Sequence, residues 1–295
     1  MRIITSVSGG LGNQLFQYAF YQYLQVNFPN YDHYLDISSF EDYKRPYLLE
    51  EIFKINGRYV ENEVIDKYKK NNLKERISNR LGMTKYVILP ESRYNSNKIK
   101  ESKNYLMTGY WQNFNMVDSI KDILNDNLVF RLKLNREECT LLESIKSNDS
   151  VSLHIRRGDY LNPENRKKFI GPCSDEYYDK AIEYFSGKYP KVVFFVFSDD
   201  DEYCRIKYGD KRNFYFVDRH LKDYYDLYFM SKCRHNIIAN SSFSWWAAWF
   251  NENEQKEIVS PSSWFNYDDI SKSILGEGWV KINRYGKQTD SPSNI

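Results

Sequence analysis

The sequence has no long hydrophobic segment. Its longest weakly charged run, residues 236–251, contains several Asn and Ser, whereas a membrane-spanning helix needs about 20 apolar residues. The opening segment MRIITSVSGGLGNQ also lacks the apolar stretch of a signal peptide, because glycines and polar residues arrive early. We therefore expect a cytoplasmic protein, or one at the inner face of the membrane, with at most peripheral membrane contact.

An excess of charge of one sign is also missing. The 295 residues include 42 Lys and Arg and 40 Asp and Glu, which gives a formal net charge of +2. Proteins that bind nucleic acids by neutralising phosphates are usually more basic, so we expect no nucleic-acid partner. Hydrophobic residues make up 41% of the chain, which excludes a disordered protein and provides for a substantial core.

Paired cysteines and common metal-binding or nucleotide-binding motifs are absent. The four cysteines are widely spaced without a CxxC pair, which indicates reduced thiols rather than a zinc site or a disulfide framework. The sequence contains no HExxH, Walker A, GxSxG or EF-hand pattern. Aromatic residues, in contrast, reach 17% with 26 Tyr. Such a content occurs in sugar-binding proteins, although a Tyr-rich core and surface is the simpler interpretation.

Short apolar segments alternate with helical segments along the chain. The expected strands are 3–7, 31–37, 105–111, 151–155, 191–197, 214–217 and 236–239. The expected helical segments are 13–26, 61–80, 141–147, 175–185 and 244–250. This alternation predicts an α/β fold in two halves. We place an N-terminal domain at 1–140, a C-terminal domain at 141–285 and a polar tail at 286–295.

A glycine-rich loop follows the first expected strand. Gly10 and Gly12 resemble the start of a dinucleotide-binding motif, and Asp32 and Asp36 stand near the position of a ribose-binding acid. However, Leu15 occupies the position of the third glycine. This departure makes NAD a poor candidate ligand.

The same loop can still bind a substrate. Gly10 and Gly12 would let the backbone approach a ligand, and the helix expected from Asn13 would direct free N–H groups toward it. The side chains of Asn13 and Gln14 can form hydrogen bonds with sugar hydroxyls. We predict that these four residues bind substrate, and the alternative is a simple tight turn into a helix.

The segment HIRRGDY, residues 154–160, ends a strand with two adjacent arginines. Ligands of open α/β sheets bind beyond the carboxyl ends of the strands, and an arginine offers a planar fork that matches phosphate oxygens. Neighbouring strand residues point to opposite faces, so only one of Arg156 and Arg157 needs to reach the ligand. The other is expected to form an internal ion pair. The alternative is two surface ion pairs.

An acidic cluster, Ser198-Asp199-Asp200-Asp201-Glu202, follows the next apolar strand. Asp199 and Asp201 could bind a divalent metal ion that holds a nucleotide-sugar diphosphate. One carboxylate could instead accept the two parallel N–H donors of guanine. The third possibility is a helix N-cap formed by Ser or Asp.

The segment NSSFSWWAAW, residues 240–249, follows the expected strand at 236–239. Short hydroxyl side chains at a helix N-terminus can bind phosphate, because O–H and N–H donors converge at the positive end of the helix dipole. Ser241 and Ser242 are the candidates. The three tryptophans continue into the expected helix, which favours a place in the core over a sugar-binding platform.

Together these segments resemble the α-1,2-fucosyltransferases of glycosyltransferase family 11. The matching segments are residues 8–20, 154–160, 197–200 and 240–249. The resemblance implies a GT-B fold, with two Rossmann-like domains facing across a cleft. It also implies a GDP-β-L-fucose donor, no bound metal and no other cofactor. Fucose would move with inversion to O2 of a terminal galactose of a glycan.

The resemblance further assigns the GDP-fucose site to the C-terminal half. Arg156 would bind the diphosphate and His154 would lie at the nucleotide. Asp200 would contact guanine, and Ser241 or Ser242 would contact the β-phosphate. The N-terminal half, with its glycine loop, would face the acceptor and the fucose.

An inverting transfer needs a base near the acceptor hydroxyl, or a phosphate oxygen that takes the proton. Asp159 is the first candidate because it is the carboxylate nearest in sequence to Arg156. Glu164 is the second, because related fucosyltransferases have a base on that loop. Asp159 could equally fix Arg157 or cap the turn.

The acceptor would be a galactose-ended glycan, and lipid-linked repeat units are candidates if the source is bacterial. The main alternative is a glycosyltransferase that uses another nucleotide sugar, with or without a metal ion. A further alternative is a protein that binds a nucleotide sugar without catalysis. Donor hydrolysis measured with and without acceptor would distinguish this last possibility.

Overall fold

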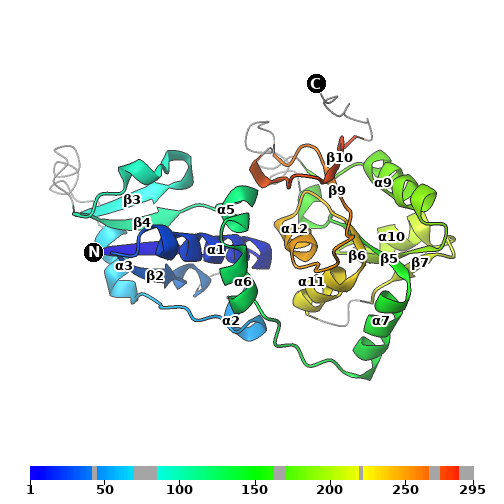
Figure 1. Cartoon of the computed structure of the whole chain (residues 1–295), viewed down its shortest axis with the longest axis horizontal. Helices are drawn as coiled ribbons and strands as arrows, with labels where there is room; N and C mark the ends of the chain where they lie inside the picture. The colour runs from blue at the N-terminus through cyan, green and yellow to red at the C-terminus, as the bar shows by residue number, and fades with distance from the viewer. Residues whose placement is uncertain (42–44, 70–84, 163–170, 219–221, 266–272, 286–295) are drawn as a thin grey trace. The chain divides into compact units, whose positions relative to one another are not determined.

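The computed structural model describes residues 1–41, 45–69, 85–162, 171–218, 222–265 and 273–285. The chain divides into two compact units, Met1–Arg131 and Leu132–Ile295. Helix α7 (Arg136–Ser147) belongs wholly to the second unit, whereas a boundary at residue 140 would cut it. In the described part of each unit a parallel sheet is accompanied by helices (Figure 1).

The described residues of the first unit form a four-stranded parallel sheet in the order β2-β1-β4-β3. The strands are β1 (Arg2–Ser6), β2 (Asp32–Asp36), β3 (Tyr86–Pro90) and β4 (Asn104–Thr108). The helices are α1 (Leu11–Asn27), α2 (Leu49–Ile52), α3 (Asn62–Lys69), α5 (Phe114–Asp118) and α6 (Lys121–Asn127). Short 3-10 turns lie at η1 (Ser38–Phe40), η2 (Glu91–Arg93) and η3 (Ser96–Lys98).

Helix α1 supplies much of the core of the first unit. Leu15, Ala19, Phe20 and Leu24 recur at helical spacing and are almost fully buried, as the sequence predicts. Phe20 and Leu24 belong to the same apolar cluster as Ile3 of β1. Because β1 is an inner strand of the sheet, these contacts place α1 beside the centre of the sheet.

The described residues of the second unit form a six-stranded parallel sheet in the order β10-β9-β8-β5-β6-β7. The strands are β5 (Asp149–Ile155), β6 (Val192–Ser198), β7 (Phe214–Phe216), β8 (His235–Ile237), β9 (Ile258–Pro261) and β10 (Val280–Ile282). Besides α7, the helices are α9 (Asp175–Lys188), α10 (Asp201–Tyr208), α11 (Asp223–Lys232) and α12 (Ser242–Trp249), with a 3-10 turn η4 (Asp159–Leu161). This strand order is that of dinucleotide-binding Rossmann domains.

Helix starts in the second unit follow local capping chemistry. Asn135 and Glu138 form a reciprocal capping box at the start of α7, and this feature explains why the helix begins earlier than its apolar residues indicate. Ser174 accepts a hydrogen bond from the N–H of Tyr177 at the start of α9. The predicted core role of the tryptophans is confirmed for Trp245 and Trp246, which are fully buried.

All the expected strands are present, with ends that shift by at most three residues. Strand β4 ends at Thr108 rather than 111, because Gly109 and Trp111 adopt positive φ angles. The strands β3, β9 and β10 and the helices α2, α5, α6 and α11 were not predicted, since most are short. Helix α10 was anticipated only through the possible N-cap in the acidic cluster. The helix expected at 61–80 is described only as α3, and the tail 286–295 lies outside the described residues. None of the described helices is long and apolar enough to cross a membrane.

Candidate functional site

In both sheets, strands that follow one another in the chain are added first on one side of a central strand and then on its other side. In the second unit, β6 lies on one side of β5 and β8 on the other. In the first unit, β2 and β4 flank β1 in the same way. Ligands of open α/β sheets bind beyond the carboxyl ends of strands at such a switch point. The segments after β5 and β8, and those after β1 and β4, are therefore the places to examine.

Arg156 follows β5 and is held by two carboxylates. Its Nη2 lies 2.7 Å from Oδ1 of Asp159, and its Nη1 lies 3.0 Å from Oδ2 of Asp199. Asp199 is brought there because β5 and β6 pair in parallel register with Ile155 opposite Ser198. A guanidinium has five N–H donors, so the two contacts leave donors for an anionic ligand.

Asp199 is the inner carboxylate of this cluster. Burial alone would raise the pKa of Asp199, but the charge of Arg156 and the Arg157 N–H, which donates to Oδ1 at 2.8 Å, bring its pKa below the usual value. Asp199 is therefore ionised at neutral pH. A Cβ at Gly158 would lie 2.6 Å from Oδ2 of Asp199, so the turn requires glycine at this position.

Arg157 makes the internal ion pair that was expected for one of the two arginines. Its Nε donates to Oδ2 of Asp200 at 3.1 Å, and its guanidinium carbon lies 3.6 Å from the centre of the Tyr203 ring. Asp200 also accepts the N–H of Tyr203 through Oδ1 and is the N-cap of α10. The N-cap interpretation of the acidic cluster is thus confirmed for Asp200.

The structure places Asp159 beside Arg156. Its Oδ1 lies 2.7 Å from Nη2 of Arg156, whereas Nε of Arg157 lies 3.1 Å from Oδ2 of Asp200. Asp159 remains 41% exposed as a side chain. The role that competes with that of a catalytic base is therefore the orientation of the Arg156 guanidinium. Glu164 lies outside the described residues.

Asp199 and Asp201 have different partners. Asp199 contacts Arg156, whereas Asp201 contacts Arg205 at 2.6 Å on the exposed side of α10. In the part of the chain that the structure describes, no three His, Cys, Asp or Glu side chains gather as metal ligands. The two carboxylates are thus engaged by arginines and do not form a pair directed at one ion.

The segment before α12 joins the same region. The Tyr160 hydroxyl donates to the carbonyl of Asn240 at 3.0 Å, and the His154 ring centre lies 5.9 Å from that of Phe243. Ser241 is the N-cap residue of α12, but its hydroxyl does not cap the helix. The loop after β5 and the predicted phosphate-binding serines are therefore brought together by the tertiary structure.

Asn240 and Arg284 support this region and were not predicted. The Asn240 Nδ2 donates to the carbonyl of Gly171 at 3.1 Å, and Arg284 Nη2 donates to the carbonyl of Pro172 at 2.6 Å. The Cys173 thiol donates to Oδ1 of Asn240 at 3.5 Å. Arg284 is only 5% exposed although it is charged. The polar sequence around Arg284, just before the tail, gives no signal for such a buried role.

The glycine loop of the first unit differs in detail from its prediction. Gly9 has a φ of 82°, Gly10 is the N-cap residue, and α1 begins at Leu11. Gly12 therefore lies buried in the first helical turn and not in the loop. A Cβ at Gly10 would lie 2.8 Å from a guanidinium nitrogen of Arg45, a residue that the sequence did not single out.

Gln14 has a structural position. Its side chain is fully buried, its Nε2 donates to the carbonyls of Gly9 and Pro46 at 3.0 Å each, and its Oε1 accepts the N–H of Leu48 at 2.9 Å. We infer that Gln14 shapes the loop rather than contacting a ligand. Asn13 is less buried, and its Oδ1 accepts a hydrogen bond from Gln112 at 2.9 Å.

Comparisons with known proteins agree with the predicted resemblance. The model of Glycosyl transferase family 11 matches residues 4–283. The O-antigen biosynthesis glycosyltransferase WbnK of Escherichia coli is 32% identical over 94% of this chain and 99% of its own. An alpha-1,2-colitosyltransferase of Escherichia coli is 30% identical over 96% and 99%. Galactoside alpha-(1,2)-fucosyltransferase 1 of Sus scrofa is 32% identical over 45% and 38%.

Among solved structures, the fold is similar to that of the fucosyltransferase NodZ from Bradyrhizobium. The TM-score is 0.51 with 13% identity, and the alignment covers 83% of this chain and 92% of NodZ. The predicted GT-B fold class, with two Rossmann-like domains, is thereby confirmed. At this identity the similarity concerns the fold alone.

Proposed function

Because the chain belongs to glycosyltransferase family 11, we propose that it is an inverting α-1,2-fucosyltransferase. It transfers L-fucose from GDP-β-L-fucose to O2 of a terminal galactose. The observation that carries this proposal is the position of Arg156 at the switch point of a Rossmann-type sheet, between the carboxylates of Asp159 and Asp199.

The chemistry of this cluster suits a nucleoside diphosphate as leaving group. Charge develops on the diphosphate as the glycosidic bond breaks, and fixed cations or N–H dipoles stabilise it. Arg156 offers a bidentate fork, and the start of α12 at Ser241 offers free N–H groups of a helix N-terminus. We propose that these groups bind the diphosphate without a metal ion.

The guanine contact proposed for Asp200 has to coexist with its other bonds. Its two oxygens already accept from Arg157 and from the N–H of Tyr203, but a carboxylate has about four acceptor positions. Asp200 can therefore accept further N–H donors. His154, at the end of β5, is proposed to lie at the nucleotide.

The proposed base is Asp159. Its side chain is the most exposed of the three members of the Arg156 cluster, so it can reach a substrate hydroxyl. Glu164 stays the second candidate. In either case the base takes the proton from O2 of galactose as that oxygen attacks the anomeric carbon.

A second donor is favoured by one relative. The alpha-1,2-colitosyltransferase matches nearly the whole chain, and colitose is fucose without its 3-hydroxyl group. A site that forms hydrogen bonds to a hydroxyl discriminates strongly against an analogue that lacks it. The competing proposal is therefore transfer of colitose from GDP-colitose.

The decisive experiment incubates the protein with GDP-fucose or GDP-colitose and a panel of galactose-ended acceptors, with and without lipid linkage. We expect a single fucosylated product with an α-1,2 linkage by NMR. A preference for GDP-colitose would show that colitose, and not fucose, is the sugar transferred. Hydrolysis of the donor at the same rate with and without acceptor would contradict transfer. A lipid-linked acceptor would fit the proposed site of action at the inner face of the membrane.

A further inference from the structure

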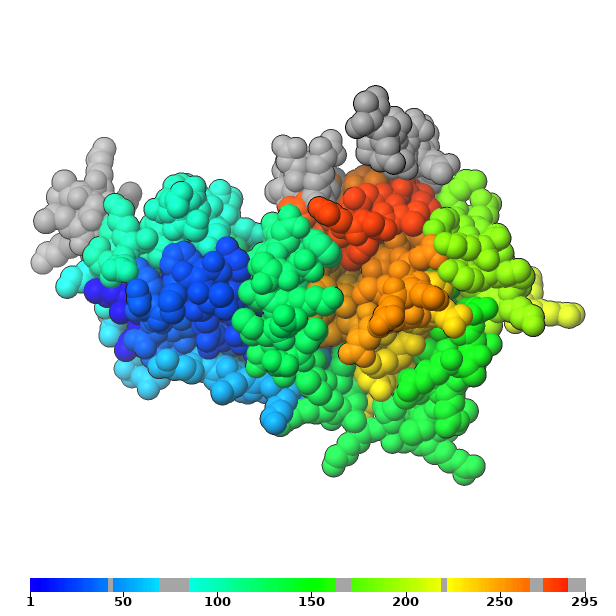
Figure 2. All heavy atoms as spheres, viewed as in Figure 1, coloured from blue at the N-terminus to red at the C-terminus, as the bar shows by residue number. Residues whose placement is uncertain are grey.

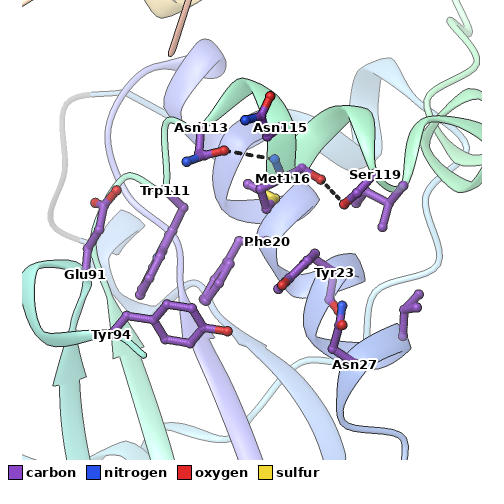
Figure 3. Close-up of a pocket in the computed structure, with 12 residues that line it drawn as sticks. Phe20, Tyr23, Asn27, Glu91, Tyr94, Trp111, Asn113, Asn115, Met116 and Ser119 are labelled. Atoms are coloured by element: carbon purple, nitrogen blue, oxygen red, sulfur yellow. Dashed lines mark hydrogen bonds between the residues drawn. The ribbon is translucent and has the colours of Figure 1, made fainter. Parts of the chain in front are cut away.

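A cavity of about 690 Å³ lies beside α1 in the first unit. Figure 2 shows α1 (blue) at the surface between the segment that follows β3 (teal) and the helices α5 and α6 (green). The lining includes four aromatic residues, Phe20, Tyr23, Tyr94 and Trp111, and three amides, Asn27, Asn113 and Asn115 (Figure 3). The glycine loop and the Arg156 cluster contribute none of the lining residues.

The aromatic wall of this cavity is held in a fixed arrangement. The rings of Phe20 and Trp111 stack with centres 3.7 Å apart, and Tyr94 meets both edge-on at 5.3 and 5.4 Å. Trp111 has a φ of 58°, which is unusual for a bulky residue. Strained backbone of this kind persists where surrounding contacts enforce it, and it often marks a functional site.

The strained turn is anchored from two sides. Nε2 of Gln17 donates to the carbonyl of Gly109 at 2.9 Å, and the N–H of Tyr110 donates to Oε2 of Glu91 at 2.8 Å. A Cβ at Gly109 would lie 2.5 Å from Cβ of Glu91. The position of Trp111 is therefore set before any ligand binds.

Two polar atoms of this wall have no hydrogen-bond partner among the described residues. They are Nε1 of Trp111, a residue only 4% exposed, and the hydroxyl of Tyr94. Figure 3 shows the Tyr94 hydroxyl pointing toward the side of the cavity formed by Tyr23 and Asn27. An unsatisfied buried donor costs about 1–3 kcal/mol. Both atoms are almost inaccessible to solvent, so a ligand that supplies an acceptor would gain this energy only after a small shift of the neighbouring side chains.

The composition of the lining selects the ligand class. The lining combines aromatic rings with the amides of Asn27, Asn113 and Asn115, and Glu91 is the one charged side chain among the described lining residues. Because the described part of the lining has no basic side chain, it does not suit a phosphate or another anion. Rings and amides together suit a neutral polyhydroxylated ligand, which has apolar C–H faces and many hydroxyls.

We propose that this cavity binds a neutral sugar residue of the acceptor glycan, separate from the galactose that receives fucose. The inference rests on the proposed glycosyl transfer to a glycan. Asn13 and Tyr23 lie on one helix, roughly 15 Å apart along its axis at 1.5 Å per residue. This separation fits an acceptor of several sugar units and would make the enzyme select for longer glycans.

Tyr94→Phe tests the proposal because it removes only the unpartnered hydroxyl. The matched control is Tyr68→Phe, which removes another buried hydroxyl without a partner among the described residues of the same unit, outside the cavity. Binding of a neutral tetrasaccharide that ends in β-galactose is measured by NMR without donor. Transfer to it and to methyl β-galactoside is then assayed.

We expect Tyr94→Phe to weaken tetrasaccharide binding roughly three- to tenfold and to raise KM for this acceptor by the same factor. The KM for methyl β-galactoside, the affinity for GDP and the stability should stay unchanged, and Tyr68→Phe should change neither these quantities nor tetrasaccharide binding. Asn115→Ala, at an exposed position of α5, should give the same selective loss.

Equal tetrasaccharide binding by the wild type and both cavity variants would overturn the proposal, whatever the transfer assay gives. Transfer to methyl β-galactoside would then show that the proposed function survives. Conversely, binding that depends on Tyr94 without any glycosyl transfer would support the cavity and contradict the proposed function.

Discussion

The two switch points have similar topology but different chemistry. After β5 and β6 in the second unit, Arg156 and Arg157 are matched by Asp199 and Asp200. After β1 and β4 in the first unit, the bond from Gln112 to Asn13 joins two neutral amides. A parallel sheet thus positions the side chains, while the residues after its strands decide whether the site suits a charged diphosphate or sugar hydroxyls.

The difference extends to how each site is stabilised. The Arg156 cluster consists of ion pairs that a diphosphate can replace in part, since phosphate oxygens offer the same acceptors. The glycine loop is held instead by the buried amides of Gln14 and Gln17, which bond to backbone groups. Substitutions in the Arg156 cluster should therefore affect the reaction first, and substitutions of Gln14 or Gln17 should affect stability first.

The largest effect is expected for Arg156→Lys. Lysine retains the charge but not the bidentate fork, so the leaving group should lose about 2–4 kcal/mol of stabilisation. The turnover number should fall roughly 30- to 1000-fold, with the fold intact by circular dichroism. Arg205→Lys, which alters an exposed ion pair on α10, is the control. Activity within threefold of the wild type would remove Arg156 from the site.

Asp159→Asn distinguishes a base from a residue that orients Arg156. If Asp159 is the base, transfer should fall about 100-fold while GDP affinity, measured by calorimetry, stays near that of the wild type. If it mainly orients Arg156, to which it lies at 2.7 Å, GDP affinity and rate should fall together. Unchanged turnover would rule out both roles and direct the search to Glu164.

Gln14→Leu should lower the stability of the first unit rather than the rate of transfer. The apolar side chain leaves the carbonyls of Gly9 and Pro46 and the N–H of Leu48 without their partner. Unfolding free energy should drop by about 2–3 kcal/mol in urea denaturation. Gln25→Leu, at a half-exposed position of the same helix, should cost no more than about 0.5 kcal/mol. Equal effects would mean that the loop does not depend on Gln14.

Glu257 and its partners form a charged cluster at the amino-terminal edge of the second sheet, opposite to the edge at which Arg156 lies. Burial would raise the pKa of Glu257, but Lys188 and the hydroxyls of Tyr184 and Tyr189 lower it from 4.5 to about 2. A lowered carboxyl pKa stabilises the folded state above pH 4.5, and this contribution disappears as the pH falls toward 2.

Glu257→Gln should therefore reduce the unfolding free energy at pH 7 by about 1–2 kcal/mol, after allowance for solvent screening. The difference from the wild type should shrink between pH 4.5 and pH 3. Glu183→Gln, in the exposed pair with Lys180, serves as the control. Because Glu257 is remote from the carboxyl ends of the strands, kcat should stay unchanged. A loss of kcat without loss of stability would contradict this structural role.

The smallest effect is expected for metal removal. If arginine and helix N–H groups neutralise the diphosphate, the initial rate of transfer should be unchanged in excess EDTA. Complete loss of activity that manganese restores would bring back the metal-binding interpretation of Asp199 and Asp201, and the ion pairs of these residues would then have to rearrange.

Much of the fold follows from local patterns. The strand at 191–197 is an apolar run after its first residue, and such a run is typical of a parallel strand that is covered on both faces. The family resemblance likewise depends on short contiguous motifs. Boundaries were predicted less well, because Gly109 and the capping box at Asn135 act through backbone geometry and single hydrogen bonds.

Which residues meet in each site was decided by the tertiary structure alone. The sequence by itself determined an α/β chain with arginines at one strand end, carboxylates after the next, and serines before a tryptophan-rich helix. It could not determine that Asp199 pairs with Arg156, that Asp159 pairs with the same arginine, or that Gln14 is buried. These outcomes depend on strand order and register, which join residues about 40 positions apart, and local propensity carries no information about such contacts.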